Sequence, residues 1–131
     1  MTPTLERAHG GRIELRVLQH SLRENLLSRQ IVLTLDGGKA VAFGAIKIYL
    51  ERFPPKARSL ILEMRQPLGT ILRTQEIAHS SRPSPYFRVE ADATIRTALQ
   101  MMDGGTLYGR QNVLLDSAGD TLARVLEILA P

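Results

Sequence analysis

The chain contains no cysteine and no tryptophan, and only 5% of its residues are aromatic. Without cysteine, disulfide bonds and thiolate metal sites are excluded. Few aromatic residues disfavour a platform on which nucleic-acid bases stack. No apolar run reaches the length of a membrane span, and the first residues lack the basic and apolar segments of a signal sequence. We therefore expect a cytoplasmic protein that binds neither a membrane nor nucleic acid.

Catalytic and cofactor-binding motifs are also missing. The three histidines (His9, His20 and His79) are far apart and do not have metal-ligand spacing. No serine occupies a GxSxG elbow, and no glycine-rich stretch has the pattern of a P-loop or a dinucleotide fingerprint. The sequence thus implies no metal and no organic cofactor.

The chain is basic, but its positive charges are scattered. The formal net charge is +4, and three of the 17 basic residues are lysines. A clustered basic footprint, which is typical of nucleic-acid-binding proteins, is absent. The arginine bias is compatible with genomic base composition and equally with recognition of carboxylates or phosphates. Nucleic-acid binding is left as an alternative suggested by net charge alone, and strong salt dependence would reveal it.

Length and hydrophobic periodicity predict one α+β domain over residues 1–131. The 131 residues, 44% of them hydrophobic, suit a single core. The order of elements predicts an antiparallel sheet of about six strands with flanking helices. The expected elements are strands at 13–17, 26–35, 39–49, 86–91, 106–115 and 121–130, helices at 2–8, 56–64 and 92–102, a helical turn at 68–72, and a loop at 80–85.

Two opposite charges lie on strand faces that otherwise read as core. Arg29 is the one polar residue among the alternate positions 27 to 35, and Glu127 is the one polar residue among positions 123 to 129. Because a strand points every second side chain to the same side, both charges should face an interior. A buried ion is costly unless it is paired or binds something. Arg29 and Glu127 therefore either neutralise each other or hold a small charged ligand.

Four stretches, taken in order, resemble the chorismate lyase family, the chorismate–pyruvate lyases that make 4-hydroxybenzoate. Each is short, and together they span nearly the whole chain. They are Met1-Thr2 with Leu5-Glu6, Ser28 to Leu33 followed by Asp36-Gly37, Gln66 to Gly69, and Leu107 to Arg110 followed by Gly119 and by Leu126 to Pro131.

The resemblance implies an antiparallel sheet with helices around a small dry pocket. The family's ring-carboxylate arginine corresponds to Arg29, and its hydroxyl-binding glutamate corresponds to Glu127. Leu68 of the Pro-Leu-Gly stretch and Met1 correspond to pocket-lining residues. Arg110 matches a further family arginine.

The chain also departs from the family pattern. It is expected to be a short member without the helical segment that precedes the Met-Thr pair in longer ones. Ala45 stands where many members have arginine, and Lys47, two residues later, is expected to supply that charge. Residues 74–105 do not align with the family.

The function implied by the resemblance is cofactor-free elimination of pyruvate from chorismate or a close relative. Arg29 would take the ring carboxylate, Glu127 would hold the hydroxyl and assist proton movement, and Lys47 or Arg110 would meet the enolpyruvyl carboxylate. The alternatives are a non-catalytic module of the same fold that binds aromatic acids, and a relative with another small carboxylate substrate. An exposed sheet edge also leaves a homodimer open.

Overall fold

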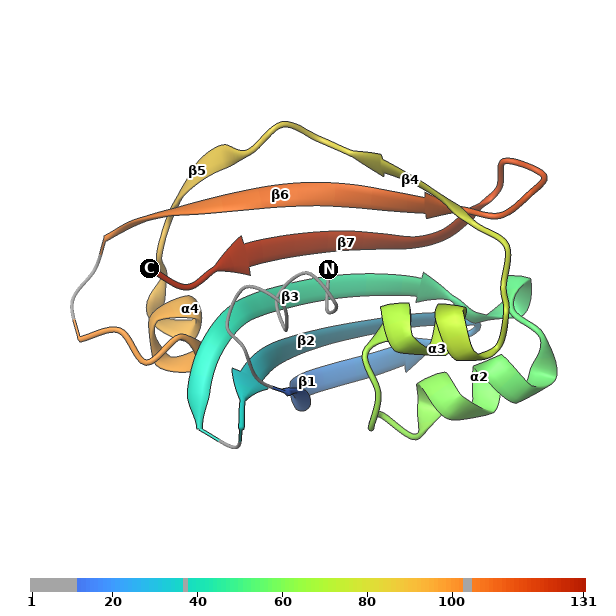
Figure 1. Cartoon of the computed structure of the whole chain (residues 1–131), viewed down its shortest axis with the longest axis horizontal. Helices are drawn as coiled ribbons and strands as arrows, with labels where there is room; N and C mark the ends of the chain where they lie inside the picture. Colours follow the sequence, from blue (N-terminus) through green and yellow to red (C-terminus); the bar gives the residue numbers. More distant parts are fainter. Residues whose placement is uncertain (1–11, 37, 103–104) are drawn as a thin grey trace.

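A single antiparallel sheet of seven strands organises the chain, and β5 pairs with β6 beside the main strand path. The computed structural model describes residues 12–36, 38–102 and 105–131. The strand order is β1-β2-β3-β7-β6-β4 (Figure 1). The strands are β1 (Ile13–Arg23), β2 (Leu26–Leu35), β3 (Lys39–Tyr49), β4 (Ser80–Pro83), β5 (Phe87–Glu90), β6 (Thr106–Leu115) and β7 (Thr121–Leu129).

Short helices cover the sheet at its two ends. They are η1 (Leu50–Arg52, a 3-10 turn), α2 (Pro55–Leu62), α3 (Leu68–Thr74) and α4 (Ala93–Ala98). Proline begins α2 and immediately precedes α3, as suits a first helical turn. Figure 1 shows α2 and α3 at one end of the sheet and α4 at the other. None of the described helices is long and apolar enough to cross a membrane.

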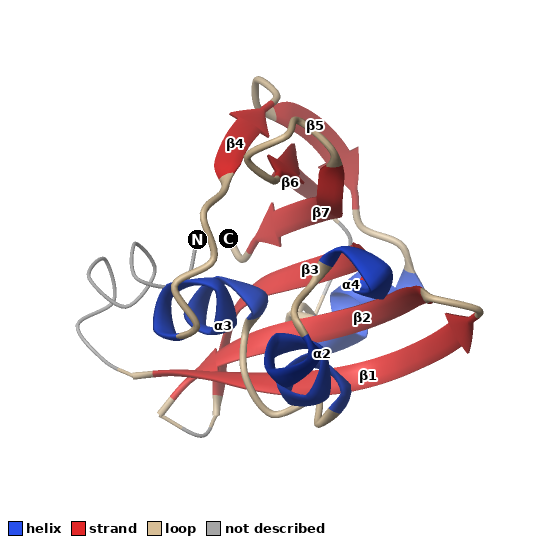
Figure 2. Ribbon diagram, turned by 90° about the vertical axis from the view of Figure 1, so that its right-hand side faces the viewer, coloured by secondary structure: helices blue, strands red, loops and turns tan. Residues whose placement is uncertain are grey.

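The sheet has a separate hydrophobic cluster on each face. On one face, which we call the α2/α3 face, the alternate residues Leu27, Ile31 and Leu33 of β2 pack with Ile61 of α2 and Ile71 of α3. The opposite face, which we call the α4 face, buries side chains of the intervening positions against α4. The strand residues Val32, Phe43 and Ile128 pack there with Ile95 of α4 and with Leu99, its C-cap. Figure 2 shows α2 and α3 on the opposite side of the sheet from α4.

The fold prediction is confirmed, with two corrections. The stretch 80–85 is not all loop, because Ser80–Pro83 forms β4 on the edge of β6. Proline is tolerated in an edge strand, so Ser/Pro composition alone is a poor loop signal here. The sheet accordingly has seven strands rather than about six.

The predicted helix at 92–102 is shorter than expected. Asp92 caps it, with its Oδ1 accepting a hydrogen bond from the Ile95 N–H at 2.8 Å. The helix ends at Ala98, and Gln100 has a φ of 60°, in the left-handed region that terminates helices. The Gln100 side chain instead bonds the β2–β3 turn, accepting from Ala40 N and donating to Gly38 O. The helix expected at 2–8 lies outside the described residues.

Candidate ligand-binding site on the α2/α3 face

Arg29 is buried in the middle of β2 without an acidic partner in the described part of the chain. Its side chain is 2% exposed, between Leu27 and Ile31 on the α2/α3 face. Nη1 donates to the Met64 sulfur at 4.0 Å, and Nε and Nη2 have no hydrogen-bond partner among the described residues. Burial lowers the pKa of Arg29 to about 10, so the group is still charged at neutral pH. Within the described ranges, this charge meets only a weak thioether acceptor.

Glu127 of β7 is a second buried charged residue. Its side chain is 8% exposed, and its strand neighbours across the sheet are Gly44 of β3 and Arg110 of β6. Burial raises the pKa of Glu127, while the charge of Arg110 acts in the opposite direction. Glu127 is therefore a carboxyl group that takes up a proton more readily than one in water.

Strand register places both charges on the same face but not in contact. One row across the sheet runs from Arg29 through Ile46 and Val125, and the next row on that face contains Gly44 and Glu127. Two strand spacings and two residues along the strand separate the Cα atoms by roughly 12 Å. No ion pair joins Arg29 and Glu127 within residues 12–36, 38–102 and 105–131. The two charges are therefore separated on this face and do not neutralise each other directly.

The residues that lie between the two charges are apolar. Ile46 and Val125 lie next to Arg29 in its row, and Gly44 lies next to Glu127. A Cβ atom at Gly44 would lie 3.1 Å from Ile31 Cγ1, which is tighter than ordinary contact. A side chain at position 44 would therefore crowd Ile31.

All the buried side-chain polar atoms that lack a partner in the described residues lie in these two rows. They are Arg29 Nε, Arg29 Nη2, Arg110 Nε and Asn112 Oδ1. Asn112 pairs with Val125 in the row of Arg29, and Arg110 pairs with Glu127. Native proteins leave few buried polar groups unpaired, so a cluster of four unpaired atoms on one face is a marker of a binding site.

Asn112 and Met64 were missed from sequence. Asn112 was detectable, because it lies on the same strand face as Arg110 and is a second polar residue there before Leu114. Met64 was read only as a hydrophobic helix position. It follows α2 with a φ of 61°, and this turn presents its sulfur to Arg29.

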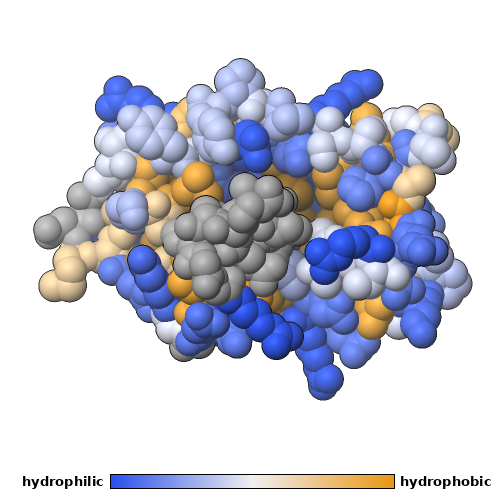
Figure 3. Space-filling view, viewed as in Figure 1, coloured by the Kyte–Doolittle hydropathy of each residue, from blue (hydrophilic) through white to orange (hydrophobic). Residues whose placement is uncertain are grey.

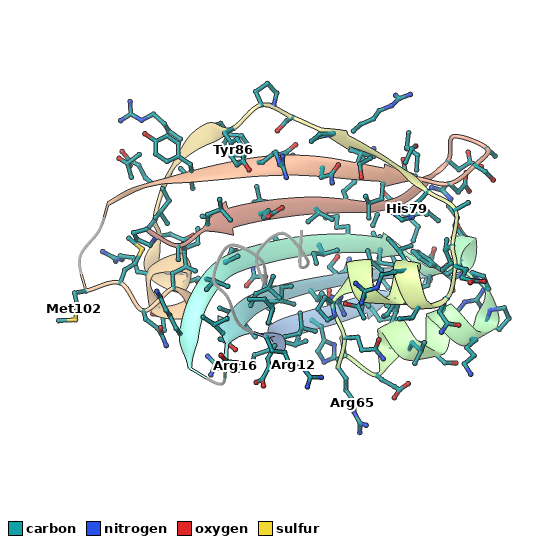
Figure 4. The ribbon with its side chains drawn as sticks, in the orientation of Figure 1. Arg12, Arg16, Arg65, His79, Tyr86 and Met102 are labelled. Carbon is teal, nitrogen blue, oxygen red and sulfur yellow. The ribbon has the colours of Figure 1, made fainter. Side chains whose placement is uncertain are left out.

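An aromatic residue borders the site beside Arg110. The Arg110 guanidinium lies 5.0 Å from the centroid of the Tyr86 ring. Tyr86 precedes β5, and Figure 4 shows its position next to β6. Stacking on the ring holds the arginine head group beside Tyr86, while the Nε atom of Arg110 is buried.

The structure brings together some of the predicted site residues and separates others. Leu68 is 5% exposed at the start of α3 and packs in the α2/α3 cluster. Lys47 is exposed and lies opposite Ser28, one position out of phase with the Ile46–Arg29 pair, so its side chain leaves from the α4 face. The structure therefore does not bring Lys47 together with Arg29, and Ala45 lies on the same α4 face as Lys47, as expected. Met1 lies outside the described residues.

The space-filling view in Figure 3 shows hydrophobic residues between hydrophilic ones on the face that carries α2 and α3. Among the described residues, no group of three or more His, Asp or Glu side chains is placed to hold a metal ion. The chemistry available at the site is therefore that of guanidinium, carboxyl, amide and apolar groups.

Comparison with known proteins identifies the fold. No protein-family model and no curated protein matches the chain. Among solved structures, PhnF from Mycobacterium smegmatis is 16% identical with a TM-score of 0.77, over 99% of this chain and 63% of PhnF. The effector domain of PhnF is also 16% identical, with a TM-score of 0.76, over 97% of this chain and 86% of that domain.

A third similar structure is the ligand-binding domain of a putative GntR-family transcriptional regulator from Bordetella bronchiseptica. It is 10% identical with a TM-score of 0.68, over 90% of this chain and 85% of that domain. The chain spans less than two thirds of PhnF itself. At these identities the likeness shows the fold and assigns no residue role. The chain thus has the α+β fold of effector domains of bacterial regulators, a fold related to that of chorismate lyase.

Proposed function

We propose that the chain is a non-catalytic module that binds a small cyclic or aromatic carboxylate on its α2/α3 face. The observation that carries the proposal is the buried guanidinium of Arg29, which has two unpaired nitrogen atoms and no acidic partner among the described residues. Leaving a buried polar group unsatisfied costs about 1–3 kcal/mol, and more when the group is charged. A carboxylate that accepts two hydrogen bonds from Nε and Nη2 removes that cost.

The neighbouring residues favour a ring behind the carboxylate. Ile46 and Val125 provide an apolar floor, and Glu127 and Asn112 provide polar groups further along the same face. A carboxyl with a raised pKa and an unpaired amide oxygen suit a ligand hydroxyl. A hydroxybenzoate combines these features, so 4-hydroxybenzoate is the first probe.

The comparisons support binding over catalysis. Two of the similar structures named above are described as an effector domain and as a ligand-binding domain. Those descriptions belong to the other proteins. For this chain they favour a function in which the ligand is held and released unchanged.

The test is to add 4-hydroxybenzoate to the purified chain and to measure binding by calorimetry and by the change in melting temperature. Binding that raises the melting temperature is expected, because a ligand that binds only the folded state stabilises it. 4-Hydroxybenzyl alcohol, which has the same ring and hydroxyl but no carboxylate, is the matched control. Equal binding of the acid and the alcohol would contradict the role given to Arg29.

A second candidate is the chorismate–pyruvate lyase activity, and the raised pKa of Glu127 favours it. A carboxyl whose burial raises its pKa, on the same face as a carboxylate-binding arginine, is suited to proton movement in the elimination. The measurement is pyruvate release from chorismate by micromolar protein, with identification of the aromatic product. Release no faster than the spontaneous rate, together with 4-hydroxybenzoate binding, leaves the binding module as the function.

A further inference from the structure

A groove of about 390 Å³ lies on the α4 face, beyond the residues that α4 covers. Its lining includes three consecutive residues from each of five strands. In β2, β3, β6 and β7 the middle residue of each triplet belongs to the row on the α2/α3 face, which consists of Arg29, Ile46, Asn112 and Val125. Because side chains alternate along a strand, the other two residues of each triplet point to the α4 face. The groove is therefore separate from the Arg29 site and has its own set of side chains.

Two cations stand side by side in this groove. Lys47 of β3 is directly opposite Arg124 of β7, and Ser28 of β2 is opposite Lys47 in the same row. Directly opposite residues have Cβ atoms about 4.5–5.5 Å apart, and like charges in this arrangement are destabilising. Lys47 and Arg124 have no hydrogen bond or ion pair within the described ranges, and the groove lining contains no Asp or Glu.

The next row of lining residues combines two amides with apolar side chains between them. Gln30 and Gln111 lie on the α4 face one row away from the cations, on either side of Ala45 and Leu126. These amides supply donors and acceptors, and the two small or aliphatic side chains supply a floor between them. The volume is within the range of about 300–1,000 Å³ that is usual for small-molecule sites.

We propose that this groove binds a small phosphate monoester. A lysine and an arginine at adjacent cross-strand positions can both reach one head group, and a phosphate dianion carries enough charge to balance the two cations. The Ser28 hydroxyl adds a donor in the same row, and the organic part of the ligand lies on Ala45 and Leu126. The site goes beyond the proposed function, because it uses the other face of the sheet.

Two other occupants fit less well. A second copy of the chain docked through this groove would place cations against cations. A nucleic-acid strand carries the same phosphates, but the groove lining has no Phe, Tyr or Trp on which bases stack. Charge complementarity thus favours a small anion.

The test is calorimetric titration of the whole chain with phenyl phosphate, a dianion with a small apolar ring. The Lys47→Gln/Arg124→Gln double variant is expected to lose about tenfold or more in affinity, which corresponds to about 1.4 kcal/mol. Lys39→Gln is the matched control, because Lys39 is an exposed lysine of the same strand outside the groove lining. Both substituted groove residues are exposed, and an unchanged melting temperature checks that the variant folds.

Three further measurements separate the outcomes. Phenyl sulfate, a monoanion of similar shape, is expected to bind more weakly than phenyl phosphate. Arg29→Met is expected to leave phenyl phosphate binding unchanged and to abolish 4-hydroxybenzoate binding, so failure of one site is distinguishable from failure of the other. The proposal is overturned if phenyl phosphate does not bind at millimolar concentration, if the double variant binds as well as the Lys39 control, or if an oligonucleotide or dimer formation accounts for occupancy of the groove.

Discussion

Arg29 and Lys47 are cations on neighbouring strands of one sheet, and they leave it from opposite faces. Arg29 is 2% exposed and has two nitrogen atoms without partners in the described part of the chain, whereas Lys47 is exposed and faces another exposed cation, Arg124. Water solvates the Lys47 charge whether or not a ligand is present, but it does not reach Arg29. The comparison shows that a cation without an anionic partner costs much free energy when it is buried on the α2/α3 face. The same kind of charge costs little when it is exposed on the α4 face.

The largest expected effect follows from replacing Arg29 by methionine. Arg29→Met is expected to weaken binding of 4-hydroxybenzoate by about 2–5 kcal/mol, because removing one partner of a buried charge pair costs that amount. The same change is expected to raise the stability of the ligand-free protein, because an apolar side chain of similar volume often replaces a buried charge at a gain. Calorimetry and urea unfolding measure the two effects.

Arg16→Met is the control for that experiment, because Arg16 is an exposed arginine of β1. It should change neither the affinity nor the unfolding free energy by more than a few tenths of a kcal/mol. Loss of binding accompanied by an equal loss of stability in Arg29→Met would mean that Arg29 has a structural role instead.

Truncation of Leu68 tests how the α2/α3 face is covered. Leu68→Ala is expected to lower the free energy of unfolding by about 2–5 kcal/mol, because the side chain is buried and leaves a cavity. Leu62→Ala is the matched control on α2, where the side chain is 42% exposed. If both variants unfold at the same urea concentration, Leu68 does not anchor α3 to the sheet.

Glu127 should give a pH dependence of opposite sign to that of an ordinary salt-bridged acid. Its pKa is raised in the folded protein above the usual 4.5, so the folded state holds the proton more tightly than the unfolded state does. Stability is then expected to fall as pH rises from about 4.5 through the folded-state pKa, and the loss remains at higher pH. Unfolding measured across this window in the wild type and in Glu127→Gln isolates the contribution.

The Glu127→Gln variant should be more stable than the wild type above this window and should lack that part of the slope. An identical pH profile in both proteins would show that Glu127 titrates as it does in the unfolded chain.

The smallest expected effect is on the α4 face. Lys47→Glu replaces a like-charge pair with an opposite-charge pair across β3 and β7, and it should stabilise the protein by about 0.2–1 kcal/mol. Urea unfolding at low and at high salt measures the gain, which should shrink at high salt. Lys39→Glu, outside the pair, should show no comparable gain; an equal gain there would assign the effect to net charge alone.

Sequence periodicity predicted the α2/α3 face well because period-2 alternation is a strong local signal. It placed Arg29 and Glu127 on buried strand faces, and both are buried there. The same reasoning placed Ser80–Pro83 in a loop, because composition does not reveal that β6 has an unpaired edge for these residues to join.

It was less predictable which residues of neighbouring strands lie on the same face of the sheet. Alternation fixes which residues of one strand share a face, but the phase of one strand relative to its neighbour depends on register. Ile46, rather than Lys47, lies opposite Arg29, so a one-residue difference sends Lys47 to the other face. The unpaired atoms of Arg110 and Asn112 likewise depend on how β6 and β7 pair, which the sequence of either strand alone does not specify.

The most direct test of the account follows the side-chain Nε–H signals of the arginines by NMR while ligand is added. The resonance missing from the Arg29→Met spectrum identifies Arg29. Addition of 4-hydroxybenzoate is predicted to shift this resonance strongly as Nε gains its missing acceptor, whereas 4-hydroxybenzyl alcohol should leave it in place. An Arg29 resonance that does not move with the acid, or that moves equally with the alcohol, would contradict the central claim that this buried cation binds a carboxylate.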